Sequence, residues 1–425
     1  MNKPKRIAIT DNIIDSKSYN IPWLYQMFKY VIGSFSDIEI VKEHDIRTED
    51  FVPQLYKALN INEKNGFSWV DIYNSNPNEE SLNIIREHFE NTFVIVFELH
   101  PFLQKALDKL NITYVNLRIH PIRYMDDIFL GITSNDKNIF DRIKKYQIPE
   151  NYFYANASLL KMQAGVAEFS GKIKIEDDSA IFFAQTNKDN SLMNNDKMTG
   201  FLDYKDEFLE ICKSYETVYY KVHPVEKNKE IINFVKSIKN VKLLYPEDIN
   251  TYDILSSDKV KKCCAVSSGT LYEAKYFGKE VQYFLKQPFM FINDYQNENE
   301  YDFKNTLIPV YKTFWQPSFW ADILQDYINI DKAVPCNINE IYSNKLRKIL
   351  NMTWSYRDFD SVYINKRINN INNNLRYLLI DKYKFKYQKY RFLSNFVWGS
   401  KKQYYKDKKY KMKELIKNCL ECKVL

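Results

Sequence analysis

Glycine is scarce in this sequence, with nine residues among 425. Neither a G-x-G-x-x-G loop nor a Walker-type loop occurs, which excludes the usual dinucleotide fingerprint and the P-loop. Any phosphate must therefore be held by other groups. The six cysteines have no disulfide-framework spacing, no signal peptide is recognised, and the C-x-x-C of Cys419 and Cys422 has no second pair of zinc ligands. We expect a cytoplasmic protein with reduced thiols.

Long apolar runs are also missing. No run reaches the roughly 18–20 residues that cross a bilayer, so we expect no integral membrane segment. Hydrophobic residues nevertheless make up 45% of the chain, enough for a sizeable core, and the length suits two domains and a tail.

Apolar runs alternate with helix-like segments in two blocks. Strands are predicted at residues 5–10, 92–97 and 112–119, and again at 179–184, 217–222, 241–244, 262–266 and 280–284. This pattern predicts an α/β protein with two Rossmann-like domains and parallel sheets. We place the domains at residues 1–170 and 171–330, followed by a helical extension at 331–425.

Polar motifs follow three strands of the second block, where ligands of parallel sheets bind. They are Gln185 with Asp189, Lys221 with His223 and Pro224, and the run Ser267, Ser268, Gly269 and Thr270. A helix N-terminus at the third motif and a histidine at the second suit a phosphate, and a carboxylate suits a base, metal ligand or nucleophile. An ordinary N-cap, a structural histidine and a surface aspartate remain the alternatives.

The first block ends two of its strands in His-Pro steps. Glu98 precedes the first step, and His120 and Arg123 belong to the second. Arginine can hold a carboxylate with two hydrogen bonds, so these residues are candidates for binding an acidic or polyhydroxylated acceptor. Solvated loop charges are the alternative.

Taken together, the motifs resemble the bacterial Kdo transferases of lipopolysaccharide and capsule synthesis, especially the retaining β-Kdo class. The ordered set is Q-T-x-x-D-x-S, K-x-H-P, the Pro246-Glu247 pair, and S-S-G-T-x-Y-E-A-x-x-x-G-K, within about residues 90–325. One departure is Ala184, where that family typically has glycine.

The resemblance implies a GT-B fold in which residues 1–170 bind the acceptor and residues 171–330 bind a CMP-β-Kdo donor. It implies that His223, Ser267, Ser268 and Thr270 hold the CMP phosphate, that Glu247 meets the ribose or cytosine, and that Asp189 is the nucleophile of a double displacement. We assign catalytic roles to Asp189, His223 and Glu98. Gln185, Lys221, Pro224 and Gly269 join the donor site, and His120 and Arg123 the acceptor site. No metal or other cofactor is expected, because no D-x-D motif flanked by strands is apparent.

Two alternatives stay open. An inverting CMP-sialic acid transferase shares the nucleotide and would use a carboxylate as base. A protein of a different class would be a non-catalytic binder of membranes or nucleic acid, driven by its basic tail.

Positive charge is concentrated near the C-terminus. Residues 382–417 contain thirteen Lys or Arg and two acidic residues, a net charge of +11 against +7 for the whole chain. Aromatic residues are interleaved with these cations, a composition that suits an anionic membrane surface. A solvated helix and nucleic-acid binding are the other interpretations, although no nucleic-acid-binding signature accompanies the charge. We expect peripheral association with the inner membrane, a glycan or lipid-linked acceptor, and no nucleic-acid partner.

Overall fold

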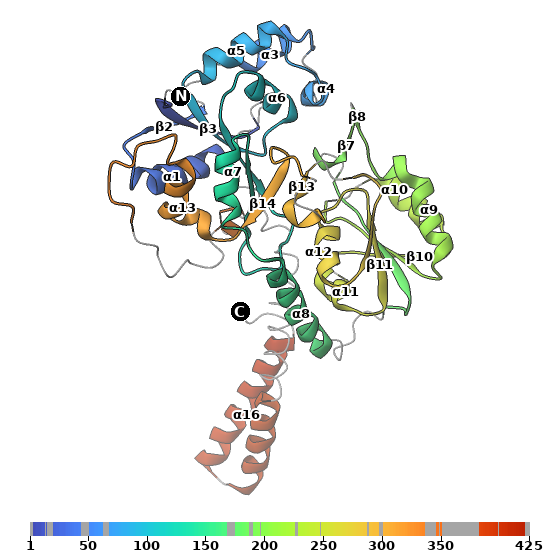
Figure 1. Ribbon diagram of the computed structural model, residues 1–425. Helices are drawn as coiled ribbons and strands as arrows, with labels where there is room; N and C mark the ends of the chain where they lie inside the picture. The colour runs from blue at the N-terminus through green and yellow to red at the C-terminus, as the bar shows by residue number, and fades with distance from the viewer. Residues whose placement is uncertain are drawn as a thin grey trace. The chain divides into compact units, whose positions relative to one another are not determined.

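The computed structural model describes residues 3–12, 14, 20–43, 51–62, 68–167, 175–186, 190–195, 197–225, 228–246, 248–286, 289–296, 301–335, 346–347, 349–350, 382–397 and 399–420. The chain divides into two compact units, Met1–Tyr356 and Arg357–Leu425. Both sheets with a buried core lie in the first unit (Figure 1).

The first sheet has seven strands in the order β13-β14-β5-β4-β3-β1-β2. Their bounds are Met290–Phe291, Thr306–Val310, Leu130–Ser134, Tyr114–Ile119, Thr92–Phe97, Arg6–Thr10 and Glu39–Lys42. Strands β4, β3, β1 and β2 are parallel, whereas β5 runs antiparallel to both β4 and β14. The sheet is therefore parallel at its centre and mixed at one side.

Helices cover both faces of this sheet, which explains why its central strands are continuous apolar runs. In β3 the side chains alternate: Phe93 and Ile95 belong to one apolar cluster, Val94 and Val96 to the other. The first cluster includes α1 (Ile21–Gly33), α7 (Lys137–Lys144) and α13 (Pro317–Leu324); the second includes α3 (Phe51–Ala58), α5 (Glu79–Phe89) and α6 (Pro101–Lys109). The short α4 (Ser68–Ile72) packs with the second cluster.

The second sheet is entirely parallel, with the strand order β10-β9-β6-β11-β12. The bounds are Val241–Leu244, Val218–Lys221, Ser179–Phe183, Val260–Ala265 and Glu280–Tyr283. Helices α9 (Lys205–Ser214) and α10 (Lys229–Ser237) pack on one face; α8 (Glu150–Ala167), α11 (Thr251–Ser256) and α12 (Thr270–Tyr276) pack on the other. A two-stranded ribbon, β7 (Met193–Asn194) and β8 (Lys197–Met198), follows β6.

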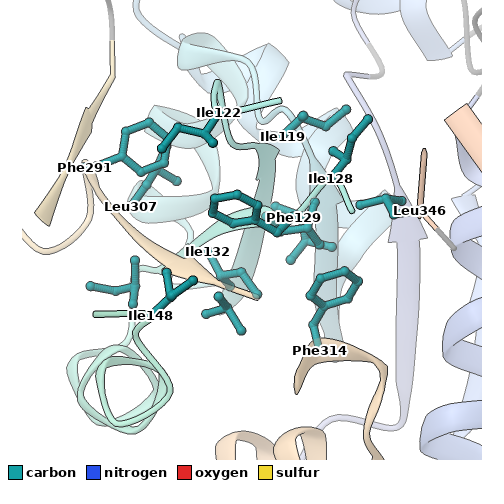
Figure 2. Close-up of a cluster of buried hydrophobic side chains, with 14 of the residues drawn as sticks. Ile119, Ile122, Ile128, Phe129, Ile132, Ile148, Phe291, Leu307, Phe314 and Leu346 are labelled. Atoms are coloured by element: carbon teal, nitrogen blue, oxygen red, sulfur yellow. The ribbon is translucent and has the colours of Figure 1, made fainter. Parts of the chain in front are cut away.

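The predicted fold class is confirmed: an α/β protein with two Rossmann-like sheets and a helical, basic C-terminal segment. The second domain was predicted to extend to residue 330, but β13, β14 and α13 belong to the first sheet and its helical layer. The reason is apolar packing: Phe291 and Leu307 join Phe129 and Ile132 in one buried cluster (Figure 2).

The second unit contains helical residues 382–396 and α16 (Ser400–Leu420). Among the residues that the structure describes, no helix is both long enough and apolar enough to cross a bilayer.

A substitution at Gly131, in β5, tests how β13 and β14 pack against that strand. A Cβ at this position would lie 2.6 Å from Phe291 Cε1 and 3.1 Å from Leu307 Cβ, and both side chains are fully buried (Figure 2). Gly131→Val should therefore lower the stability by roughly 1–3 kcal/mol through overpacking. The melting temperature, followed by differential scanning fluorimetry, measures this change.

Gly33→Ala is the matched control, because nothing lies within 4 Å of its added Cβ. At the end of α1 this change should be neutral or stabilising, by up to about 1 kcal/mol. Equal melting temperatures for Gly131→Val and the wild type would contradict the packing of β13 and β14 described above.

Candidate active site

The second sheet reverses its strand order beside β6. From β6 the chain moves outward through β9 to β10, then returns to β11 on the other side of β6. Loops that leave two adjacent strands in opposite directions open a crevice at the carboxyl edge, which is where ligands bind in such sheets. Gln185 follows β6 and Ser267 follows β11, so two predicted site residues flank this switch point.

Gln185 and Ser267 are hydrogen-bonded to each other across the switch point. The side-chain Oε1 of Gln185 accepts the Ser267 backbone N–H at 2.8 Å, and the side-chain Nε2 of Gln185 donates to Ser267 Oγ at 2.9 Å. Ser267 Oγ in turn donates to Ser191 Oγ at 2.9 Å. Ser267 is fully buried. Its backbone N–H is already used within the protein, so it fixes the loop rather than presenting that group to a phosphate.

The next residues complete a compact turn into α12. Ser268 Oγ accepts the Thr270 backbone N–H at 3.3 Å and lies 3.3 Å from the Thr270 hydroxyl. Gly269 approaches Pro121 of the first block so closely that a Cβ would lie 3.1 Å from Pro121 Cβ. Ser268 therefore has a local capping role. Position 269 is a glycine because the chain there closely approaches the His120-Pro121 step.

His223 stands at the end of β9 in a defined local geometry. Its Nδ1 accepts the backbone N–H of Val225 at 3.4 Å. A neutral imidazole has one donor and one acceptor nitrogen, so Nε2 carries the proton. The ring is half-buried and Pro224 is exposed. His223 can therefore donate through Nε2 near the same carboxyl edge.

Lys221 lies two residues before His223 but is buried. Its Nζ donates to the backbone carbonyl of Tyr245 at 2.9 Å. Tyr245 starts the turn after β10, in which its own N–H is held by the Asp248 carboxylate at 2.7 Å. The ammonium thus joins the ends of β9 and β10.

The other two His-Pro steps form the same turn. His100 Nδ1 accepts from Phe102 N–H at 3.3 Å, and His120 Nδ1 accepts from Ile122 N–H at 3.2 Å. Unlike His223, both rings are fully buried. Burial lowers the pKa of His100 to about 3, and it holds the pKa of His120 well below the ordinary value.

The predicted acceptor contact of His120 is wrong. Its ring centroid lies 4.3 Å from those of Phe129 and Phe291, and Phe153 and Tyr272 complete the aromatic enclosure. With no exposed surface, the ring cannot meet a saccharide. It is a core residue that sets the turn into residues 121–125.

Arg123 holds its own segment in place. Its guanidinium donates to the His120 carbonyl, and its backbone N–H donates to Glu273 Oε1 at 2.5 Å. The Arg347 guanidinium donates to the Arg123 carbonyl at 2.7 Å. Arg123, which was predicted to bind the acceptor, thus uses at least one guanidinium N–H to hold the backbone of its own loop.

Glu273 was not predicted, although it lies at the centre of this region. It is on α12 and only 4% exposed, and Oε1 also accepts from the Tyr252 hydroxyl at 3.0 Å. Burial raises the pKa of this carboxyl to about 7, against the hydrogen bonds and the Arg123 charge, which lower it. The sequence feature that could have indicated Glu273 is a charged residue between Tyr272 and Ala274, on the buried side of a short helix.

The first sheet also has a switch point, between β1 and β3. Asp11 follows β1 and is buried; Glu98 follows β3 and is half-buried. Glu98 has a left-handed backbone with φ of 56°, held by its N–H, which donates to the Leu117 carbonyl at 2.7 Å. The next N–H, of Leu99, donates to the Asn116 side chain at 3.0 Å. Such strain in a non-glycine residue gathers at functional sites.

Two predicted residues, Asp189 and Glu247, lie outside the described residues. Asp11 was missed by the sequence analysis; the signal was a carboxylate directly after an apolar strand.

Comparison with known proteins gives one match at the level of sequence families. Residues 100–286 match the family described as alpha-2,8-polysialyltransferase (POLYST). This region contains the carboxyl-edge motifs of the second sheet and the His120-Pro121 step. Glycosyltransferase is the class of enzyme that the match indicates. A search of curated proteins finds no match.

Solved structures with distant similarity to this chain include three glycan-related enzymes. Two are KpsC from Thermosulfurimonas dismutans: the beta Kdo 2,7 transferase (14% identity, 48% of this chain and 68% of that one, TM-score 0.29) and the beta Kdo 2,4 transferase (15%, 65% and 79%, 0.31). The third is the UDP-GlcNAc 2-epimerase from Neisseria meningitidis bound to UDP-GlcNAc (13%, 65% and 81%, 0.24).

The buried carboxylate makes stability depend on pH in a defined direction. The ordinary pKa of Glu273 is 4.5 and the folded value about 7, so between these values the unfolded chain releases a proton that the folded chain keeps. The stabilising contribution is complete below pH 4.5 and is lost as pH rises to about 7, by roughly 3 kcal/mol in total.

Glu273→Gln retains an acceptor oxygen but cannot ionise, so it resembles the protonated wild type. Its melting temperature relative to wild type should rise between pH 5 and pH 8. Glu176→Gln, which removes an exposed carboxylate, should give no such trend. A difference between Glu273→Gln and wild type that stays constant with pH would show that Glu273 does not titrate in this window.

Proposed function

We propose that this chain transfers a 2-keto sugar acid from a CMP-linked donor to a saccharide acceptor during synthesis of a surface polysaccharide. The observation that carries the proposal is the carboxyl edge of the second sheet. There Gln185 and Ser267 fix two loops at the switch point, and His223, after the neighbouring strand, has a protonated Nε2. In parallel sheets, nucleotides bind in the crevice at such a switch point.

The leaving group supports the same proposal. In a CMP-sugar, the bond from the anomeric carbon to a phosphate oxygen breaks, and negative charge grows on that phosphate. The His223 Nε2–H can donate a hydrogen bond that stabilises this charge on the departing phosphate, so the reaction needs no metal at this point. Lys221 would act indirectly, by holding the turn at Tyr245–Asp248 beside the nucleotide.

Two donors fit this chemistry. The family match favours CMP-sialic acid, whereas the ordered motifs resemble transferases that use CMP-β-Kdo. Both sugars carry a carboxylate on the carbon that bears the phosphate. We therefore test CMP-sialic acid first and CMP-Kdo beside it.

The two donors imply different roles for carboxylates. In an inverting reaction, Glu98 removes a proton from the acceptor hydroxyl, whose oxygen bonds to the anomeric carbon as CMP leaves. In a retaining reaction, Asp189 first replaces CMP and forms a glycosyl-enzyme, which the acceptor then displaces. The strained backbone of Glu98 favours a functional role for that carboxylate in either case.

The first experiment measures CMP release from each donor with the full chain. His223→Ala should lower the rate of transfer by roughly 10²–10³-fold and weaken CMP binding, because the donor to the leaving phosphate is lost. Lys239→Ala is the control, since Lys239 is exposed and lies just before β10, at the amino edge of the same sheet. Wild-type rates for His223→Ala would remove His223 from the site, and release of CMP from neither donor would refute the proposal.

The second experiment distinguishes inversion from retention. NMR of the product gives the anomeric configuration, and mass spectrometry of the enzyme with donor alone detects a one-sugar adduct. For retention, Asp189→Asn should abolish transfer and the adduct should map to the Asp189 peptide. For inversion, no adduct should form and Glu98→Gln should reduce transfer by about 10²–10⁴-fold. An inverted product with full activity in Glu98→Gln would refute the role of Glu98 as base.

A further inference from the structure

The second unit presents an apolar ridge made of Phe385, Phe392 and Phe396. Their exposed fractions are 71%, 62% and 67%, which is unusual for three large apolar side chains on one short helix. The spacings of seven and four residues place all three within about 40° of arc on one face. Phe392 and Phe396 are in contact, with ring centroids 4.5 Å apart.

The opposite face of the same helix is already occupied. Tyr390 stacks on Tyr405 of α16 with a centroid distance of 6.2 Å, and Ser394 and Met412 are buried. The helix formed by residues 382–396 and α16 therefore pack against each other through this inner face. The ridge of phenylalanines is on the face turned away from α16.

Basic residues flank the ridge on both sides. The helix carries Lys382, Lys384, Lys386, Lys389 and Arg391, and residues 382–396 contain no acidic residue. At 100° per residue, Lys389, Lys382 and Lys386 fall on one side of the ridge, and Lys384 and Arg391 fall on the other. This like charge disfavours a second copy of the same face as the partner.

We propose that this ridge is a docking surface for anionic lipid bilayers, with the phenylalanines inserted at the headgroup level and the flanking cations on lipid phosphates. A bilayer surface offers both properties that the face requires, an apolar layer directly beneath a sheet of negative charge. Double-stranded RNA would satisfy the cations but leave a contiguous apolar ridge in water, and single-stranded RNA, whose bases can stack on aromatic rings, is an outcome of the test. The proposal does not depend on the sugar donor.

Vesicle sedimentation with the full chain tests the proposal. The wild type should bind vesicles of phosphatidylcholine mixed with phosphatidylglycerol, bind pure phosphatidylcholine much more weakly, and dissociate as salt rises, because charge attraction is screened over about 8 Å at physiological ionic strength. The triple variant Phe385→Gln, Phe392→Gln, Phe396→Gln should lower the partition coefficient at least about tenfold.

Matched variants separate the two contributions of the surface. Lys382→Gln, Lys386→Gln and Lys389→Gln should each lower binding to the anionic vesicles about fivefold. The control replaces Tyr30, Leu159 and Met162 with Gln, because these side chains are exposed to a similar degree in the first unit; it should bind as the wild type does. Circular dichroism checks that helix content is retained.

Three results would overturn the proposal: wild-type partitioning of the triple phenylalanine variant, equal binding to both vesicle types, or binding to RNA oligonucleotides without binding to vesicles. CMP release on a soluble acceptor is measured in parallel and should be the same for the wild type and the triple variant. Loss of the vesicle result with CMP release intact would reject this surface alone, and the reverse would reject the proposed reaction alone.

Discussion

The Glu273 carboxylate lies in the protein interior, and two donors from separate strand-end segments meet it there. One is the backbone N–H of Arg123, from the loop that follows β4; the other is the Tyr252 hydroxyl, on α11. A buried charge is unfavourable unless it is paired or protonated, and both donors lower the free energy of the ionised form. Gly269, directly before α12, closely approaches Pro121 in the same loop as Arg123. One titratable interior group thus joins α12 to the loop after β4 and to α11.

The three His-Pro steps form the same local turn, but their histidine rings differ in burial. In each His-Pro step the ring accepts the N–H two residues later, because proline ends the strand and leaves that N–H without a ladder partner. The turn fixes the tautomer in all three. Only packing decides the rest: aromatic rings enclose His120, whereas His223 stays half-buried. Sequence spacing predicts the turn but not the enclosure, which comes from Phe129 and Phe291, 9 and 171 residues further along the chain.

The same distinction runs through the fold. Continuous apolar runs such as residues 92–97 predicted the parallel strands, because a strand buried on both faces has no alternative pattern. The proximity of Gln185 and Ser267 could then be predicted, because each follows a strand and parallel strands end at the same edge of the sheet. The attachment of β14 to β5 did not follow, because antiparallel pairing with a strand more than 170 residues earlier leaves no periodic trace. Glu273 was missed for a related reason: its partners come from the loop after β4 and from α11.

Glu98 shows how a local irregularity can point to chemistry. A left-handed backbone is unfavourable by about 1–2 kcal/mol for most side chains, and asparagine and aspartate tolerate it best. Among the described residues, five of the other positions with this conformation are Asn or Asp: Asn60, Asn91, Asn111, Asn195 and Asp178. Lys312, with φ of 60°, is the sixth non-glycine position. At the end of β3, beside the switch point of the first sheet, the chain has glutamate in this conformation. The turn does not require that longer carboxylate, which is why we propose a role for its side chain beyond the turn.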